Sequence, residues 1–369
     1  FLDRGAYVVG APEYILGQDF AALEKRTAPY AAQGCRVLLL AQCDGAEIGR
    51  LHGVVIPLAL LVLENPIRPN APKVFDYFHT QGVDVKVISG DNPVTVSAVA
   101  AQAGIRNAEQ WVDARELQTD QDIAAAVREY TVFGRVVPNQ KRKIVRALQS
   151  QGHTVAMTGD GVNDAPALKA ADIGCAMGKT GTDVAKGAAD MILTDDNFAT
   201  IVAAIEEGRG IYSNIRKAIH YLLSCNIGEI ITIFVATLLD LGQMPLVPVQ
   251  LLWLNLVTDS LPALALGVEP VEEGVMEQRP RDARAELFDR RFSLRLAWQG
   301  LMVGGLTLAA YYLGLTRLSR PGLEGAAANT MAFATLTMCQ LFHAFNVRSE
   351  DRSLLEQGLL SNPAMNKAF

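Results

Sequence analysis

The sequence is poor in cysteine, has only a small excess of negative charge, and shows no long apolar run before about residue 211. Its cysteines have no paired spacing, which argues against a disulfide framework or a thiolate metal site and suits a reducing cytosol. The five positions are Cys35, Cys43, Cys175, Cys225 and Cys339. A formal net charge of −6 gives no reason to expect a nucleic-acid partner. The chain begins at Phe1 without a methionine or a signal peptide, and we expect it to be part of a longer polypeptide.

The apolar residues that make up half of the chain are distributed unevenly. Up to about residue 207, short apolar runs alternate with helical patterns, and one of these runs, Leu58–Leu63, predicts a buried strand. Strand followed by helix, repeated, indicates a parallel doubly wound sheet, which binds ligands at the carboxyl ends of its strands. Longer apolar runs follow. We therefore predict a soluble half followed by an all-helical membrane half.

In the soluble half, two glycines flank Asp160 directly after a short apolar strand pattern, Thr154–Met157. Asn163 and Asp164 follow before an alanine-rich helical segment. Glycines allow a tight turn and a close approach to a ligand, and carboxylates are the hard ligands that Mg²⁺ takes together with a phosphate. The alternative interpretation is an ordinary surface turn. A bare Gly-Asp-Gly favours the surface turn, and the choice between the two interpretations depends on the longer stretch from Thr158.

Two other segments belong with this turn. Ser89, Gly90 and Asp91 follow the strand pattern Val83–Ile88, and Lys141 opens a basic helical segment after a proline turn. A solvated basic face is the alternative for Lys141. Phosphoryl transfer depends mainly on positioning and charge neutralisation, and a hydroxyl, a lysine and paired aspartates can supply both. The candidate catalytic residues are Ser89, Gly90, Asp91, Lys141, Asp160, Asn163 and Asp164.

The membrane half contains four candidate spans, at about 215–241, 246–268, 294–315 and 326–347. Arginines and lysines precede the first span, follow the last, and are numerous between the second and third. The turn at Gly242–Val247 has no charge, and the other loop on that side has few charges. This asymmetry predicts that the soluble half and both chain ends are cytoplasmic.

Polar side chains recur within these spans. Asn226 and Glu229 share one helical face, as do Asn255, Thr258 and Asp259 on the next span. A carboxylate near the middle of a membrane costs about 2.5 to 3.5 kcal/mol, so we expect these residues to have a function. An all-oxygen cluster suits a hard cation such as Ca²⁺, and Pro262 would free backbone carbonyls by opening the helix. The alternative is an interhelical hydrogen-bond network without an ion.

These motifs resemble those of a known family. The stretch from Thr158 resembles the hinge motif of P-type cation-transporting ATPases and motif IV of the haloacid-dehalogenase fold. The segments S-C-N-I-G-E and L-L-W-L-N-L-V-T-D-S-L-P resemble membrane helices five and six of the P2 group, nearest its calcium pumps. Gly10–Glu13 resembles a nucleotide-domain motif in which Val9 replaces a lysine. Asn65 and Gln340 replace acidic residues of the family pattern.

The resemblance implies a fold and a set of roles. It implies the C-terminal part of a nucleotide-binding domain at 1–56, an α/β haloacid-dehalogenase-like phosphorylation domain at 57–207, and a transmembrane helix bundle at 208–369. By this resemblance, Arg36 and Arg68 are expected to bind the nucleotide and Asp160 is expected to be a Mg²⁺ ligand. ATP is the implied phosphoryl donor. The implied ligands of the transported cation, most readily Ca²⁺, are Asn226, Glu229, Asn255, Thr258 and Asp259.

No Asp-Lys-Thr-Gly-Thr motif occurs, so the nucleophilic aspartate of the family is expected upstream of Phe1, with the actuator domain and the first membrane helices. We expect this chain to be inactive alone and the complete protein to be an ATP-driven translocase in lipid, most simply a bacterial plasma membrane. Specificity for Mn²⁺ or a monovalent cation stays open, as does a non-hydrolytic regulatory pseudo-pump. A phosphatase fused to a membrane anchor is disfavoured, because an anchor has no use for carboxylates within its spans.

Overall fold

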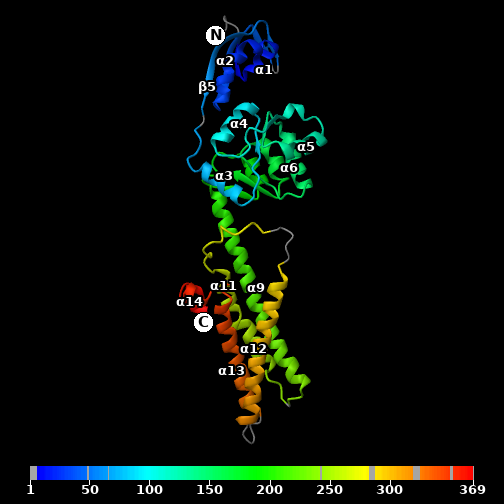
Figure 1. Ribbon diagram of the computed structural model, residues 1–369, viewed down its shortest axis with the longest axis vertical. Helices are drawn as coiled ribbons and strands as arrows, with labels where there is room; N and C mark the ends of the chain where they lie inside the picture. Colours follow the sequence, from blue (N-terminus) through cyan, green and yellow to red (C-terminus); the bar gives the residue numbers. More distant parts are fainter. Residues whose placement is uncertain are drawn as a thin grey trace. The chain divides into compact units, whose positions relative to one another are not determined.

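The computed structural model describes residues 6–47, 50–64, 66–241, 243–281, 287–318, 325–349 and 352–368. It divides into two compact units, Phe1–Ala203 and Ala204–Phe369 (Figure 1). Each unit has hydrophobic cores of its own. The first unit is mixed α/β, and the second is helical.

The first unit begins with a three-stranded antiparallel sheet in the order β1-β2-β5. Its elements are β1 (Ala6–Gly10), α1 (Pro12–Leu16), α2 (Ala21–Ala32), β2 (Arg36–Cys43) and β5 (Ile56–Leu63), with a small hairpin of β3 (Gly45–Glu47) and β4 (Arg50–His52). The prediction of a buried strand at Leu58–Leu63 was right about the strand and wrong about its burial. The strand forms, but nearly all its side chains are exposed. It is an edge strand, and β2 is the strand paired with it among the described strands.

The rest of this unit contains two three-stranded parallel sheets, in the orders β6-β8-β7 and β11-β10-β9. Their strands are β6 (Val87–Ile88), β7 (Trp111–Asp113), β8 (Val132–Gly134), β9 (Ala156–Gly159), β10 (Ile173–Met177) and β11 (Met191–Leu193). The intervening helices are α3 (Ala71–Thr80), α4 (Pro93–Gln102), α5 (Asp120–Glu129), α6 (Pro138–Ser150), α7 (Ala165–Leu168) and α8 (Asp183–Ala188). Ile88 packs against the cores of both sheets, so the two parallel sheets share a boundary.

The second unit is built from long helices. They are α9 (Thr200–Leu238), α10 (Pro248–Trp253), the π-helical turn η4 (Leu254–Thr258), α11 (Ser260–Gly267), α12 (Arg290–Arg317) and α13 (Ala326–Asn346), followed by short α14 (Leu354–Gln357) and α15 (Pro363–Ala368). By length and composition, three described stretches could cross a membrane: Thr200–Leu238, Pro248–Gly267 and Arg290–Arg317. The fourth predicted span is the helix α13, which is not among these three.

Glycines set the close packing of α9 against α12. A Cβ added to Gly300 would lie 2.4 Å from Ile227 Cγ2, and one added to Gly304 would lie 2.9 Å from the Gly228 carbonyl oxygen. Small residues at such crossings let helix backbones approach closely. The helix that carries Glu229 is therefore held against its neighbour one residue away from that carboxylate.

In the first unit, an ionic network joins β7, β8 and the start of α1. Arg135 donates to Asp113 at 2.7 Å and to Glu13 at 2.5 Å, and Arg115 also donates to Asp113 at 2.7 Å. Asp113 and Arg135 are nearly buried. Burial raises the pKa of Asp113, but hydrogen bonds from Arg115 and Arg135 outweigh it and lower the pKa to about 2.

This network predicts a pH-dependent contribution to stability. A carboxyl group whose pKa is lowered on folding stabilises the fold above its unfolded pKa of about 3.9, and the contribution is lost as the pH falls toward 2. We expect Asp113→Asn to lower the free energy of unfolding by about 2 kcal/mol at pH 7. The difference from wild type should shrink between about pH 4 and pH 2. Urea unfolding across this range measures it.

Asp120→Asn is the matched control, because Asp120 is exposed and its ion pair with Lys143 is on the surface. It should change the free energy of unfolding by less than about 0.5 kcal/mol at every pH. Equal effects of the two substitutions would contradict a special role for the Asp113 network.

Candidate functional site

The turn after β9 is organised around Asp164. Its Oδ2 accepts hydrogen bonds from the backbone amides of Gly161 at 3.0 Å and Asp160 at 3.3 Å. A Cβ on Gly159 would lie 2.6 Å from the Asp164 Cβ, so only glycine fits at the end of this strand. The glycine-rich sequence thus brings a carboxylate back over the strand end that precedes it.

Lys141, in the first turn of α6, completes this arrangement. Its Nζ lies 2.6 Å from Asp164 Oδ1, and both side chains are at most 15% exposed. Two residues that the sequence assigned to separate motifs are therefore in direct contact. A nearly buried cation beside a strand end can neutralise phosphoryl oxygens.

The turn after β6 holds Ser89, Gly90 and Asp91. The Ser89 hydroxyl accepts from the Asp91 amide at 3.1 Å, and Asn92 caps α4 by accepting from the Val94 amide at 2.9 Å. The amide of Arg135 donates to the Asp91 carbonyl at 2.8 Å. Arg135 has φ of 52°, a strained value for a residue other than glycine. The chain after β8 thus holds this turn through its backbone.

Other predicted site residues of the first unit lie at the surface. Asp160 and Asn163 are exposed, and Asp160 is the carboxylate nearest in sequence to the buried Lys141–Asp164 pair. A solvent-accessible carboxylate fits Mg²⁺, which keeps several waters and takes one or two carboxylates together with phosphate oxygens. Arg36 lies 3.5 Å from Asp91, and Arg68 is exposed. Asn65 lies outside the described residues.

In the second unit, Glu229 on α9 is buried and meets amides from two other elements. Asn255 Nδ2 donates to its Oε2 at 3.0 Å, and Gln340 Nε2 on α13 donates to its Oε1 at 2.9 Å. The structure therefore brings Glu229 and Asn255 together, as the sequence predicted for a shared cluster. Gln340, which the sequence marked only as a departure from the family pattern, is a direct partner of Glu229.

Asp259, the residue after η4, is also buried, with 1% of its surface exposed. The Tyr221 hydroxyl donates to its Oδ1 at 3.2 Å. Among the described side chains, its Oδ2 and the Gln340 Oε1 are buried oxygens without a hydrogen-bond partner. Buried acceptors are expensive to leave unpaired. An unpaired carboxylate oxygen and an unpaired amide oxygen are groups that a cation could coordinate.

The backbone at this cluster departs from the α-helical pattern. η4 is a π-helical turn in which the Asp259 amide donates to the Leu254 carbonyl at 2.9 Å. Pro262, which has no amide proton, follows one turn later. The predicted opening of the helix corresponds to a widened turn over Leu254–Thr258, a kind of irregularity that is frequent at functional sites.

Two other predicted cation ligands, Asn226 and Thr258, have no hydrogen bond to Glu229 or Asp259 among the described contacts. Asn226 donates to the Leu222 carbonyl of its own helix at 2.9 Å, and Thr258 is buried next to Asp259. No group of three His, Cys, Asp or Glu side chains that could hold a metal occurs among the described residues, so the cluster depends on amide and hydroxyl oxygens. Sequence reasoning missed Tyr221, although its spacing of eight residues from Glu229 places both on one helical face.

The two family models that match cover different halves of the chain. Residues 5–172 match haloacid dehalogenase-like hydrolase, and residues 243–369 match cation transporting ATPase, C-terminus. The fold and the two family models thus define a haloacid dehalogenase-like hydrolase domain followed by the C-terminal part of a cation-transporting ATPase. The chain belongs to the P-type cation-transporting ATPases.

The relatives that this chain matches include several calcium-transporting ATPases. The chain is 44% identical to calcium-transporting ATPase 1 of Bacillus cereus over 86% of this chain and 37% of the relative. It is 45% identical to the calcium-transporting ATPase of Bacillus subtilis over 79% of this chain and 33% of that protein. It is 39% identical to the human calcium-transporting ATPase type 2C member 1 over 92% of this chain and 36% of that protein. The chain spans little more than a third of the length of these relatives.

The buried pair of the first unit allows a matched comparison. We expect Asp164→Asn to lower the free energy of unfolding by about 3 kcal/mol, because it leaves the Lys141 charge buried without its partner. The same change at exposed Asp160 should cost less than about 0.5 kcal/mol. Denaturant unfolding of the two variants measures the difference. Equal stability would show that the Lys141–Asp164 contact does not hold this turn.

Proposed function

We propose that this chain is the C-terminal part of an ATP-driven P2-type pump that exports Ca²⁺ through an aspartyl-phosphate cycle. The first unit supplies the magnesium and phosphate site, and the second supplies part of the cation site. The carrying observation is the pair of buried carboxylates, Glu229 and Asp259, whose surroundings leave oxygen acceptors unpaired.

The charge of the cluster supports a divalent cargo. The negative charges of Glu229 and Asp259 can together balance one divalent cation. The other ligands of the cation would be amide, hydroxyl and backbone oxygens from Asn226, Asn255, Thr258 and Gln340. Oxygen ligands of this kind suit Ca²⁺ rather than soft metals. The Gln340 side chain is neutral, so it adds no negative charge that could balance a second cation. The names of the relatives cited above favour the same ion.

The first unit supports phosphoryl transfer. In this proposal Lys141 neutralises phosphoryl oxygens, Ser89 offers a hydroxyl, and exposed Asp160 would hold Mg²⁺, with Asp164 holding the turn and Lys141 beside it. When bound, Mg²⁺ neutralises charge on the phosphoryl group. ATP is the proposed donor, with Arg36 and Arg68 near it. The chain has no Asp-Lys-Thr-Gly-Thr motif, so the proposal assigns the nucleophilic aspartate to another part of the full-length protein.

The proposal places the spans in a membrane, with the first unit on the cytoplasmic side. The basic residues that precede α9 and those between α11 and α12 support this orientation. A bacterial plasma membrane is the proposed location.

Ion-dependent ATPase activity of the full-length protein tests the cargo. We expect micromolar Ca²⁺ to stimulate hydrolysis, and Asp259→Asn to abolish the stimulation because the site loses one of its two charges. Activation by Mn²⁺ or K⁺, but not by Ca²⁺, would overturn the ion assignment. Failure of the wild-type protein to hydrolyse ATP with any of these ions would favour a regulatory pseudo-pump.

Phosphoenzyme formation tests the first unit separately. Asp160→Asn should prevent Mg²⁺-dependent incorporation of phosphate from labelled ATP, because the substitution removes a carboxylate charge from the proposed magnesium site. Normal phosphoenzyme levels in this variant would remove the role assigned to Asp160. Its unchanged unfolding free energy, expected above, excludes misfolding as the cause of a loss.

A further inference from the structure

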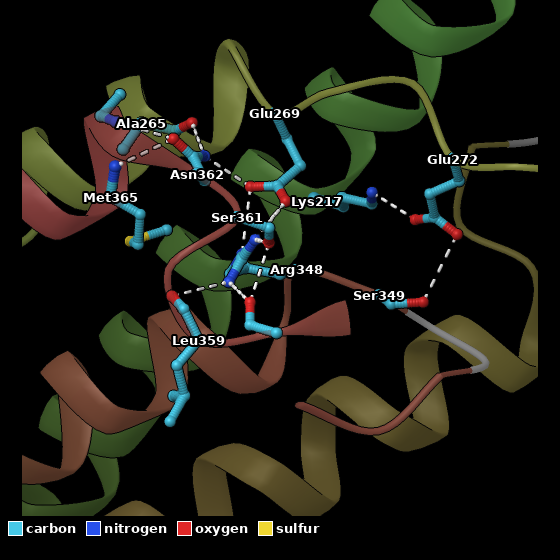
Figure 2. A network of polar contacts seen from close by, with 12 residues as sticks. Lys217, Ala265, Glu269, Glu272, Arg348, Ser349, Leu359, Ser361, Asn362 and Met365 are labelled. Atoms are coloured by element: carbon cyan, nitrogen blue, oxygen red, sulfur yellow. Dashed lines mark hydrogen bonds and ion pairs between the residues drawn. The ribbon is translucent and has the colours of Figure 1, made fainter. Parts of the chain in front are cut away.

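A second polar cluster lies where α11 and α13 end, and it centres on Arg348 (Figure 2). The Arg348 side chain is fully buried and that of Glu269 is 5% exposed. Arg348 Nη2 lies 2.8 Å and Nε 3.1 Å from Glu269 Oε1. The same guanidinium donates to the carbonyls of Gly358 and Leu359 and to the Ser361 hydroxyl. Each of its three nitrogens has a partner.

Glu269 is held from several sides. Asn362 Nδ2 donates to its Oε2 at 2.5 Å and to the Ala265 carbonyl of α11 at 3.0 Å. The backbone carbonyl of Glu269 accepts a hydrogen bond from Asn214 Nδ2 of α9 at 2.6 Å. Just beyond it, Lys217 of α9 forms an ion pair with Glu272 (Figure 2). We call the contacts of Glu269 with Arg348, Asn362 and Asn214 the clamp.

The clamp joins the same three elements that form the cation cluster. α9 carries Asn214 and Glu229, α11 leads from Asp259 to Glu269, and α13 leads from Gln340 to Arg348. Helices that touch at one place can pivot about it, whereas a second attachment removes that freedom. The clamp therefore restricts how Glu229, Asp259 and Gln340 can move relative to one another.

Stability alone does not account for this arrangement. Removing two charges from water costs several kcal/mol per ion, and apolar residues of similar size often serve a fold equally well. What apolar residues lack is the fixed geometry of a guanidinium paired twice with one carboxylate. This geometry specifies one orientation of α11 relative to α13.

We propose that Arg348, acting through Glu269, is a positioning residue for the cation site. The clamp holds the helices at the spacing at which Glu229, Asp259 and Gln340 can share one ion. This inference rests on the proposed function of that site. It assigns Arg348 no contact with the ion.

The test uses the full-length pump in membranes, with the double variant Glu269→Leu/Arg348→Met, which replaces the buried pair by apolar side chains and leaves no lone charge. Two phosphorylation reactions are compared. Phosphorylation by ATP is titrated with Ca²⁺, and phosphorylation by inorganic phosphate is measured without Ca²⁺. We expect half-maximal phosphorylation by ATP to need about tenfold more Ca²⁺, with phosphorylation by inorganic phosphate unchanged.

Arg352→Met is the matched control. Arg352 lies four residues after Arg348, and its ion pair with Glu273 is on the surface. This variant should behave as wild type in both reactions. An unchanged Ca²⁺ requirement in the double variant, a parallel loss of both phosphorylation reactions, or an equal shift in Arg352→Met would overturn the positioning role.

A distance measurement separates this inference from the proposed function. Spin labels at Leu264→Cys on α11 and Phe342→Cys on α13, both exposed positions between clamp and cation cluster, report the helix spacing by pulsed electron paramagnetic resonance. We expect a broader distance distribution in the double variant than with the native pair. If no cation activates the wild-type pump, the proposed function fails. The distance distribution still decides whether the clamp positions the helices, and identical distributions would show that it does not.

Discussion

The second unit depends on one constraint: the carboxylates of Glu229 and Asp259 are buried between its helices. Glu229 is accommodated because amides from Asn255 and Gln340 donate to its two oxygens. Asp259 has one such donor, the Tyr221 hydroxyl, and its second oxygen is unpaired among the described residues. Burying such a group is costly unless something binds it. The π-helical turn, the glycines between α9 and α12, and the convergence of three helices all serve to place these two side chains.

The first unit follows a different constraint, which is that parallel strands end at one edge of a sheet. In the turn after β6 the Ser89 hydroxyl accepts a backbone amide, and in the turn after β9 the Asp164 carboxylate does so. Lys141 contacts Asp164 from α6, the helix that precedes β9 in the chain. Charge and backbone dipoles are thus gathered before any ligand arrives. Such preorganisation is the main contribution that a protein makes to phosphoryl transfer.

The sequence was sufficient for the alternation of strands and helices and for the parallel pairing, because both depend on local pattern or on chain order. It assigned Lys141 and Asp164 to separate motifs, and their contact depends on how α6 packs against the turn after β9. It also predicted a polar cluster that includes Glu229 and Asn255, because both are polar side chains within apolar spans. It could not place Gln340, Tyr221 or Arg348, whose partners are 38 to 111 residues away and depend on helix packing. The exposed faces of β5 were missed because apolarity indicates burial but does not show what covers a strand.

The helix α9 is continuous over its whole length. The helix runs without interruption through 39 residues, from Thr200, next to the boundary of the first unit, to Leu238, beyond Glu229. At 1.5 Å per residue such a rod is about 58 Å long, and it contains no proline at which it could bend. The chain therefore passes from Thr200 to Glu229 within one continuous run of helical hydrogen bonds, and no proline removes a donor from that run.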